Sequence, residues 1–219
     1  MNLTALPVRP RCRVIVDNDW SGDPDGLLAL AHHLLSPSNR VVAVTSSFLS
    51  PQFGSPLSRA ADGAGLAARL VEEVGPAEPP IVAAGCESPF DATPSEGDAP
   101  PAVDAIIAEA HRDERLPLYL VCWVGGSLDP ATPEYNRDTD PAAAAYVLDR
   151  SDLEITQIPV EAYQQCAVSV AELEHGLCSN GALGRWLFER FTSLHLPEVI
   201  ELGEVWPIGD SPRSRVTTP

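Results

Sequence analysis

The chain has 219 residues and a formal net charge of −17, with 44% hydrophobic and 21% charged residues. This length allows one sizeable core or at most two small domains. The negative charge argues against nucleic acid and anionic membranes as partners, because both require a cationic protein surface. All fourteen cationic residues are arginines, and the lack of lysine excludes a P-loop, a Schiff base and a Ser–Lys dyad.

The chain has five cysteines, which is an odd number, and no two of them form a Cys-x-x-Cys pair. Several lie in apolar runs. This pattern predicts reduced, buried thiols in a cytoplasmic protein. Residues 1–13 lack the long apolar segment of a signal peptide, and no stretch approaches the length of a membrane span. We therefore expect a cytoplasmic protein without a membrane partner.

Strand-like apolar runs alternate along the chain with segments of helical periodicity. The first strand, Arg13–Asp17, precedes an acidic loop and a helix over 26–35 that Ser36 and Pro37 end. The later predicted strands are 41–45, 81–84, 118–122 and 153–158, and the later predicted helices are 57–74, 102–111, 141–148, 167–175 and 183–193. The alternation predicts a single α/β domain over residues 1–219, with a mostly parallel sheet and helices on both faces.

The loop after the first strand is the most informative feature, because such sheets bind ligands at the carboxyl ends of their strands. Asp17, Asp19, Asp23 and Asp25 place four carboxylates within nine residues, and the loop contains no cationic side chain. Crowded carboxylates repel one another unless a cation lies between them. A hard divalent ion with oxygen ligands, calcium rather than magnesium, fits this arrangement.

Three other interpretations of the loop are an acidic turn, a phosphatase motif and an EF-hand. It could be a solvated acidic turn, or the Asp17-x-Asp19 pair of a phosphatase, although such enzymes generally use a basic residue, usually lysine, to hold the phosphate. An EF-hand is excluded because its twelfth position is Leu28 rather than glutamate, and because a strand precedes the loop instead of a helix.

Three segments, in order, resemble the inosine-uridine preferring nucleoside hydrolases. The run VIVDNDWSGDPDGLLAL at 14–30 is similar to their N-terminal signature of a strand, DxDPGxDDAxAL and a helix, with one extra loop residue as in divergent nucleoside hydrolase-like proteins. Pro133–Asn136 with Asp140–Ala143 is similar to EFN…DPEAA, which contacts ribose. Gly209–Pro212 resembles the region of the last metal-binding aspartate.

The resemblance implies a metal site and a catalytic base. Asp19 would bind calcium and act as the general base that deprotonates the attacking water. Asp25 and Asp210 would complete the calcium site, and Asp17 would shape the loop from behind the metal-bound residues. Taken alone, Asp210 is also explained as an ordinary turn aspartate in Gly-Asp-Ser-Pro.

The same resemblance implies a ribose site formed by Asp23, Glu134 and Asn136. For Glu134 and Asn136 the alternative is a plain loop before a helix, with Asp140 as N-cap and Pro141 at the first helical position. The implied activity is calcium-dependent hydrolysis of the N-glycosidic bond of ribonucleosides to ribose and free base. Carboxylates suit it because the transition state resembles an oxocarbenium ion.

The sequence also departs from the family pattern. A GPLTN segment with its helix and strand is expected between Cys122 and Trp123, and a further C-terminal helix is expected after 212. The histidine that often precedes the last aspartate is replaced by Gly209. A catalytically inactive calcium- or sugar-binding remnant is therefore the alternative function, and the family's tendency to oligomerise makes a homo-oligomer possible.

Overall fold

The structure, a computed structural model, describes residues 8–22, 24–50, 55–91, 99–118, 121–150, 152–194 and 203–210. Asp23, the predicted ribose ligand in the acidic loop, lies outside these ranges. The described residues form an α/β fold with mostly parallel strands, which confirms the fold class predicted from the sequence. No helix among them is long and apolar enough to cross a membrane.

Two groups of parallel strands place β1 in the middle of the molecule. One sheet has the order β1 (Cys12–Asn18), β2 (Asn39–Ser46), β3 (Ile81–Ala84), and β4 (Val121–Val124) pairs with β5 (Ile155–Ile158). A parallel bridge joins Arg13 to Leu118, and the Arg13 amide donates to the Pro117 carbonyl at 2.7 Å. The segment leading into β4 therefore runs beside the edge of β1 opposite β2, and the strand order reverses there.

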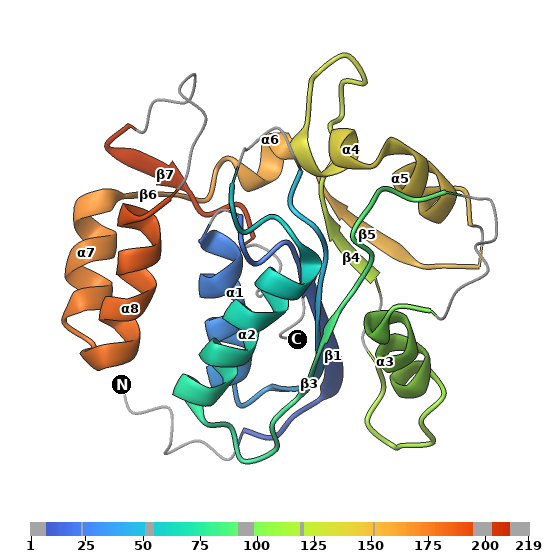
Figure 1. The fold of residues 1–219 in the computed structure, drawn as a ribbon, viewed down its shortest axis with the longest axis horizontal. Helices are drawn as coiled ribbons and strands as arrows, with labels where there is room; N and C mark the ends of the chain where they lie inside the picture. Colours follow the sequence, from blue (N-terminus) through green and yellow to red (C-terminus); the bar gives the residue numbers. More distant parts are fainter. Residues whose placement is uncertain are drawn as a thin grey trace.

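Helices cover both faces of the three-stranded sheet (Figure 1). On one face lie α1 (Asp25–Leu35) and α2 (Ala60–Val74), and α3 (Pro101–Ala110) lies on the other. Val14 and Val16 of β1 pack with α1 and α2 in the main core, whereas Ile15 packs with the alanines of α3. This alternation follows from the two-residue period of a strand.

The C-terminal third adds a helical hairpin and a short ribbon. The hairpin of α7 (Val170–Cys178) and α8 (Gly181–Thr192) packs beside α1 and α2, and Trp186 and Leu187 join the main core. β6 (Ala167–Ser169) pairs antiparallel with β7 (Val205–Pro207). The remaining elements are α4 (Tyr135–Thr139), α5 (Pro141–Leu148) and α6 (Val160–Tyr163).

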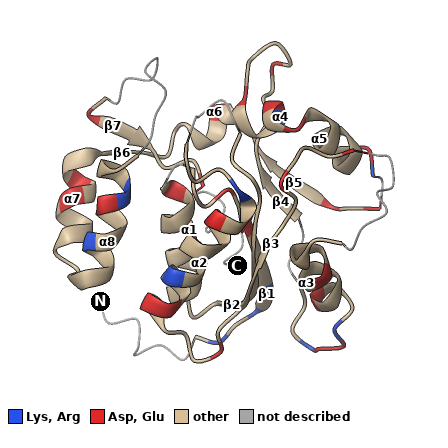
Figure 2. Ribbon diagram, in the orientation of Figure 1, with Lys and Arg blue, Asp and Glu red and all other residues tan. Residues whose placement is uncertain are grey.

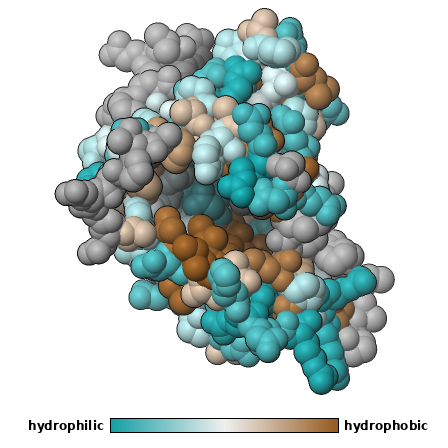
Figure 3. Space-filling model, turned by 90° about the vertical axis from the view of Figure 1, so that its right-hand side faces the viewer, coloured by the Kyte–Doolittle hydropathy of each residue, from teal (hydrophilic) through white to brown (hydrophobic). Residues whose placement is uncertain are grey.

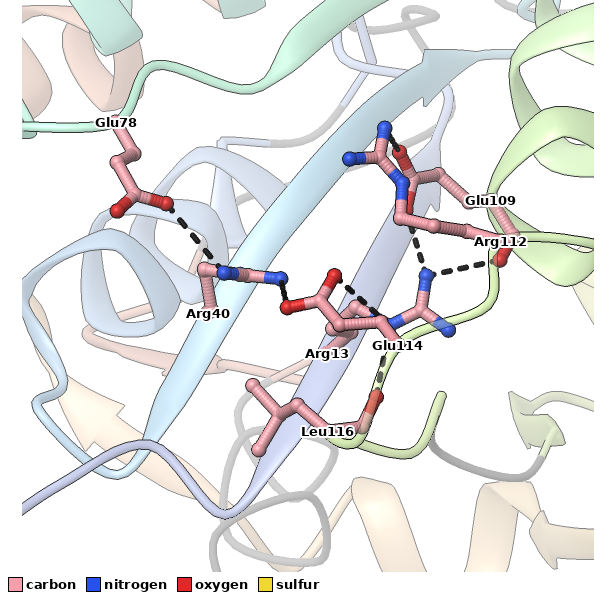
Figure 4. Close-up of polar contacts among 7 residues, drawn as sticks. All are labelled: Arg13, Arg40, Glu78, Glu109, Arg112, Glu114 and Leu116. Carbon is pink, nitrogen blue, oxygen red and sulfur yellow. Dashed lines mark hydrogen bonds and ion pairs between the residues drawn. The ribbon is translucent and has the colours of Figure 1, made fainter.

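A buried ion-pair network anchors α3 and the segment after it to the strands. Figure 4 shows Arg13 of β1 and Arg40 of β2 reaching toward Glu109 and Glu114. Arg13 Nη1 lies 2.8 Å from Glu109 Oε2, and Arg112 also contacts Glu109. The network therefore holds the middle of the sheet at the end opposite the acidic loop.

One side of the molecule carries apolar surface. Figure 3 shows apolar side chains gathered in a hollow on the side where Figure 1 places α3, β4 and α5. α3 buries its small residues Ala102 and Ala105 and leaves Val103, Ile106 and Ile107 exposed. Its larger apolar side thus faces away from the sheet.

Several sequence-based boundaries need correction. α2 begins at Ala60 rather than Leu57, and the helix predicted from 167 begins at Val170 because its first three residues form β6. The short elements α4 and β7 were not predicted at all. Of the five cysteines predicted to be buried, Cys12 and Cys122 are, whereas Cys86 is exposed.

Candidate functional site

A cavity of about 520 Å³ opens beside the carboxyl end of β1. Asp19 from the acidic loop, Asp25 from the start of α1 and Asp210 from beyond β7 all line it. The fold therefore brings three carboxylates that were predicted to share a site to one cavity. Asp210 does so although it lies 185 residues after Asp25 in the chain. Its volume lies within the range of about 300–1,000 Å³ usual for small-molecule sites.

The acidic loop is held in place by a buried tryptophan. Trp20 packs in the main core with 1% of its surface exposed, and its indole N–H donates to the Thr45 carbonyl at 2.8 Å. The Gly22 amide donates to the Asp19 carbonyl at 2.7 Å, which closes a turn. One face of the loop is thereby fixed to β2, and the Asp19 side of the loop lines the cavity.

Asp25 and Asp210 are directly linked. The Asp210 amide donates to Asp25 Oδ2 at 2.9 Å, and the Asn18 carboxamide donates to Asp210 Oδ2. Gly26 leaves room for the Asn18 carboxamide, because a Cβ atom at Gly26 would lie 2.6 Å from Asn18 Nδ2 and would force it to shift. The segment between β7 and Asp210 is fixed as well, because the Ile208 amide donates to the Cys166 carbonyl at 2.8 Å.

Asp19 has a partner that the sequence argument missed. The Tyr135 hydroxyl donates to Asp19 Oδ2 at 2.8 Å and accepts from the Ser50 amide at 3.3 Å. Burial, followed by the nearby Asp19 charge, raises the pKa of Tyr135 above its usual value. The phenol therefore stays protonated and fixes one oxygen of Asp19. The signal was available, because Tyr135 stands where the resembling EFN segment has phenylalanine.

Glu134 supports the cavity wall and does not line it. The side chain is 3% exposed, and it caps α4 by accepting from the amides of Asn136 and Arg137. It also accepts from the Gly126 amide at 2.6 Å and from the Tyr163 hydroxyl at 2.9 Å. Four donors of the chain thus occupy the two carboxylate oxygens. The predicted contact of Glu134 with ribose stays a prediction, and this geometry does not support it.

Asn136, by contrast, lines the cavity at the end of β4. Its carboxamide N–H donates to the Val124 carbonyl at 3.0 Å. None of the hydrogen bonds described involves the carboxamide oxygen, which can therefore contact a ligand in the cavity. Tyr163, held by Glu134, lines the same wall. Burial chiefly, and then the hydrogen bond to Glu134, raises the pKa of Tyr163 above its usual value.

A second cavity of about 310 Å³ adjoins the first. Asp17, at the end of β1, lines only this second cavity and accepts from the Thr45 hydroxyl at 2.7 Å. Asp140, which also lines it, caps α5 by accepting from the Ala143 amide at 2.9 Å, as predicted. Residues common to both cavities include Asp19, Tyr135, Asn136 and Asp210, which form the wall between them.

The oxygen donors of this wall are of the kind that a hard divalent cation prefers. Asp19, Asp25 and Asp210 offer carboxylates, and Asn18 offers a carboxamide oxygen. As the described residues lie, no three acidic, histidine or cysteine side chains form a group that could hold a metal ion. These oxygen donors are of the type that calcium takes, although in the described geometry they do not form a metal-binding group.

Known proteins show the same fold. No family model matches the sequence, and no curated protein matches it. Among solved structures, an inosine-guanosine nucleoside hydrolase matches with a TM-score of 0.69 and 12% identity, covering 94% of this chain and 78% of that one.

Two effector proteins match as well. Effector protein XOO4466 has a TM-score of 0.60 and 18% identity, covering 83% of this chain and 65% of that one. Type III effector protein XopQ, complexed with adenosine diphosphate ribose, has a TM-score of 0.55 and 16% identity, covering 84% and 67%. At these identities the likeness shows the fold alone: the chain has a nucleoside hydrolase-like α/β fold.

Proposed function

We propose that the chain hydrolyses the N-glycosidic bond of ribonucleosides, with calcium as cofactor. The observation that supports this proposal is the meeting of Asp19, Asp25 and Asp210 at one cavity beside the carboxyl end of β1. A site at the point where strand order reverses is where an open α/β sheet binds its ligand. The nucleoside hydrolase-like fold agrees with a ribosyl ligand, as does the adenosine diphosphate ribose bound by one structural neighbour.

In the proposed reaction Asp19 accepts a proton from water. The water oxygen bonds to C1′ of the ribosyl group, and the C1′–N bond breaks with its electron pair leaving on the base. The carboxylates of Asp25 and Asp210 stabilise the positive charge that grows on the sugar. Asp19, Asp25 and Asp210 would hold the calcium ion, which when bound supplies Lewis acidity and a template for a sugar diol and a water.

Sugar recognition is assigned to Asn136, which lines the cavity, and to Asp23, which lies outside the described residues and is assigned from the resemblance alone. We propose that Asn136 binds ribose hydroxyls and that Asp23 does so from the acidic loop. Glu134 acts through its neighbours, because it fixes α4 and the Tyr163 hydroxyl that donates to it.

The test is release of free ribose from inosine, guanosine, uridine and cytidine, with calcium and with chelator. Hydrolysis should require calcium, and Asp19→Asn should abolish it because the base is lost. Asp152→Asn is the control, since Asp152 is exposed and, among the described residues, pairs with Arg150 away from the cavity. Ribose release that persists at the wild-type rate in Asp19→Asn would refute the assigned base.

A second candidate function is binding of calcium or a sugar without hydrolysis. The described carboxylates do not form a metal-binding group, and Asp25 accepts from the Asp210 amide; this weighs against calcium-dependent hydrolysis but leaves binding of a sugar in the same cavity. Thermal unfolding with calcium, with chelator and in Asp25→Ala separates the candidates. A calcium-dependent rise in midpoint that the variant loses, without hydrolysis of any nucleoside, supports binding alone. A transition unaffected by calcium contradicts the metal site in both.

A further inference from the structure

The main cavity is lined by side chains of both charges. Asp19, Asp25 and Asp210 supply the acidic groups, and α8 supplies a cationic one. Arg190 is the one cationic residue among the described residues that line the cavity. Arginine is scarce on this molecule compared with acidic residues, as Figure 2 shows, and α8 is one of the elements that carry it.

Arg190 makes no hydrogen bond or ion pair with the described part of the chain. Its Nε–H is covered by protein yet has no acceptor, and the same holds for the Trp206 indole N–H on the same cavity wall. Buried donors without an acceptor are costly, and each such group calls for an explanation. A ligand in the cavity does not reach these covered atoms, so the terminal Nη groups of Arg190, which make no hydrogen bond with the described residues, are the donors that Arg190 can offer to it.

Stacking orients the Arg190 guanidinium. Its Cζ atom lies 5.7 Å from the centroid of the Trp186 ring, and Arg69 Cζ lies 5.0 Å from the same centroid. Neither arginine has an ion-pair partner among the described residues, although acidic groups outnumber cationic ones by 31 to 14. An arginine stacked on an aromatic face keeps its N–H groups for acceptors in its own plane, which suits phosphate oxygens.

We propose that Arg190 binds a phosphate group of a ribosyl ligand whose sugar lies at the aspartates. The inference rests on the proposed function and narrows it, because the substrate class becomes phosphorylated ribosyl compounds instead of plain nucleosides. The structural alternative is that Arg190 only packs on Trp186 and complements the C-terminal end of the α8 dipole.

The experiment is isothermal titration of four probes, namely ribose, ribose 5-phosphate, adenosine and adenosine monophosphate, in calcium-containing buffer. The wild type should prefer each phosphorylated probe by roughly ten- to a hundredfold, as expected for charge-assisted hydrogen bonds. Arg190→Gln keeps most of the side chain and should remove that preference while leaving ribose and adenosine binding unchanged. Arg185→Ala on the same helix is the control, because Arg185 is exposed and does not line the cavity.

Each outcome has a defined meaning. Equal binding of phosphorylated and plain probes by the wild type overturns the phosphate site and leaves the hydrolase proposal standing. A phosphate preference that survives in Arg190→Gln, with an unchanged thermal midpoint, overturns the assignment to Arg190. Failure of the folded wild type to bind any of the four probes contradicts the proposed function as well.

Discussion

The Arg13–Glu109 ion pair allows a quantitative test of how β1, the strand that carries the site, is held. The two side chains are 4% and 2% exposed, and Arg13 Nη1 lies 2.8 Å from Glu109 Oε2. Glu109→Gln keeps the shape of the side chain but removes its charge, which leaves a desolvated guanidinium. Arg13 would keep the carbonyls of Leu116 and residue 109, each at 2.9 Å, and the Glu114 carboxylate at 4.0 Å.

Removing one partner of a buried pair costs about 3–5 kcal/mol. Because Arg13 retains these acceptors, we expect Glu109→Gln to lower the free energy of unfolding by about 3 kcal/mol, the lower end of that range. Urea unfolding measures it as a shift in midpoint at an unchanged m-value. The exposed pair of Arg150 and Asp152 provides the matched control, and Asp152→Asn should leave the urea midpoint unchanged.

A loss below about 1 kcal/mol in Glu109→Gln would place the pair in the range of surface ion pairs and refute the argument. The double variant Arg13→Met, Glu109→Leu gives an independent test. It removes both charges together, so it should be more stable than Glu109→Gln if desolvation of the orphaned Arg13 causes the loss.

The other predictions concern the site and two helix caps. Tyr135→Phe should lower kcat for nucleoside hydrolysis with little change in KM, because it removes the hydroxyl that donates to Asp19 at 2.8 Å; an unchanged kcat would rule out this positioning role. Asp140→Ala should lower stability by about 1 kcal/mol in urea unfolding, since α5 loses its N-cap, and no shift would mean the cap is dispensable. Ser169→Ala should raise the pKa of Glu172 toward its usual value in an NMR titration, because the Ser169 hydroxyl is the main cause of the lowered pKa; coincident titration curves would exclude this. The lowered pKa favours the fold above the pKa of the unfolded chain, and this contribution is lost as the pH falls through the folded pKa.

The sheet and its main helices could be predicted because their signals are local. The β-branched run at β1 and the leucine spacing of α1 follow from burial of one strand and one helix face. Two of the missed elements give no clear local signal, because one is too short to show periodicity and the other depends on a distant partner. α4 has five residues and is capped by Glu134, whereas β6 exists only because residues 205–207 pair with it.

The candidate site divides in the same way. The crowding of Asp17, Asp19 and Asp25 is visible in the sequence because all three lie within nine residues. The hydrogen bond from Tyr135 to Asp19 spans 116 residues, and no periodicity or spacing predicts which oxygen it reaches. At Glu134 the motif matched but the predicted contact did not follow from it. The sequence does not reveal that four donors of the chain already occupy this carboxylate.

The ribbon of β6 and β7 determines how the site can come apart. A two-stranded ribbon is marginally stable on its own. In β7 no side chain is fully buried, so little packing holds the ribbon closed. Its opening would withdraw Asp210 from Asp25 while the β1–β2–β3 sheet stays intact, so amide hydrogens of β7 should exchange with solvent far faster than those of β2. Faster exchange in β7 would mean that the Asp210 side of the cavity opens without unfolding of the sheet, so that a folded chain need not carry an assembled site.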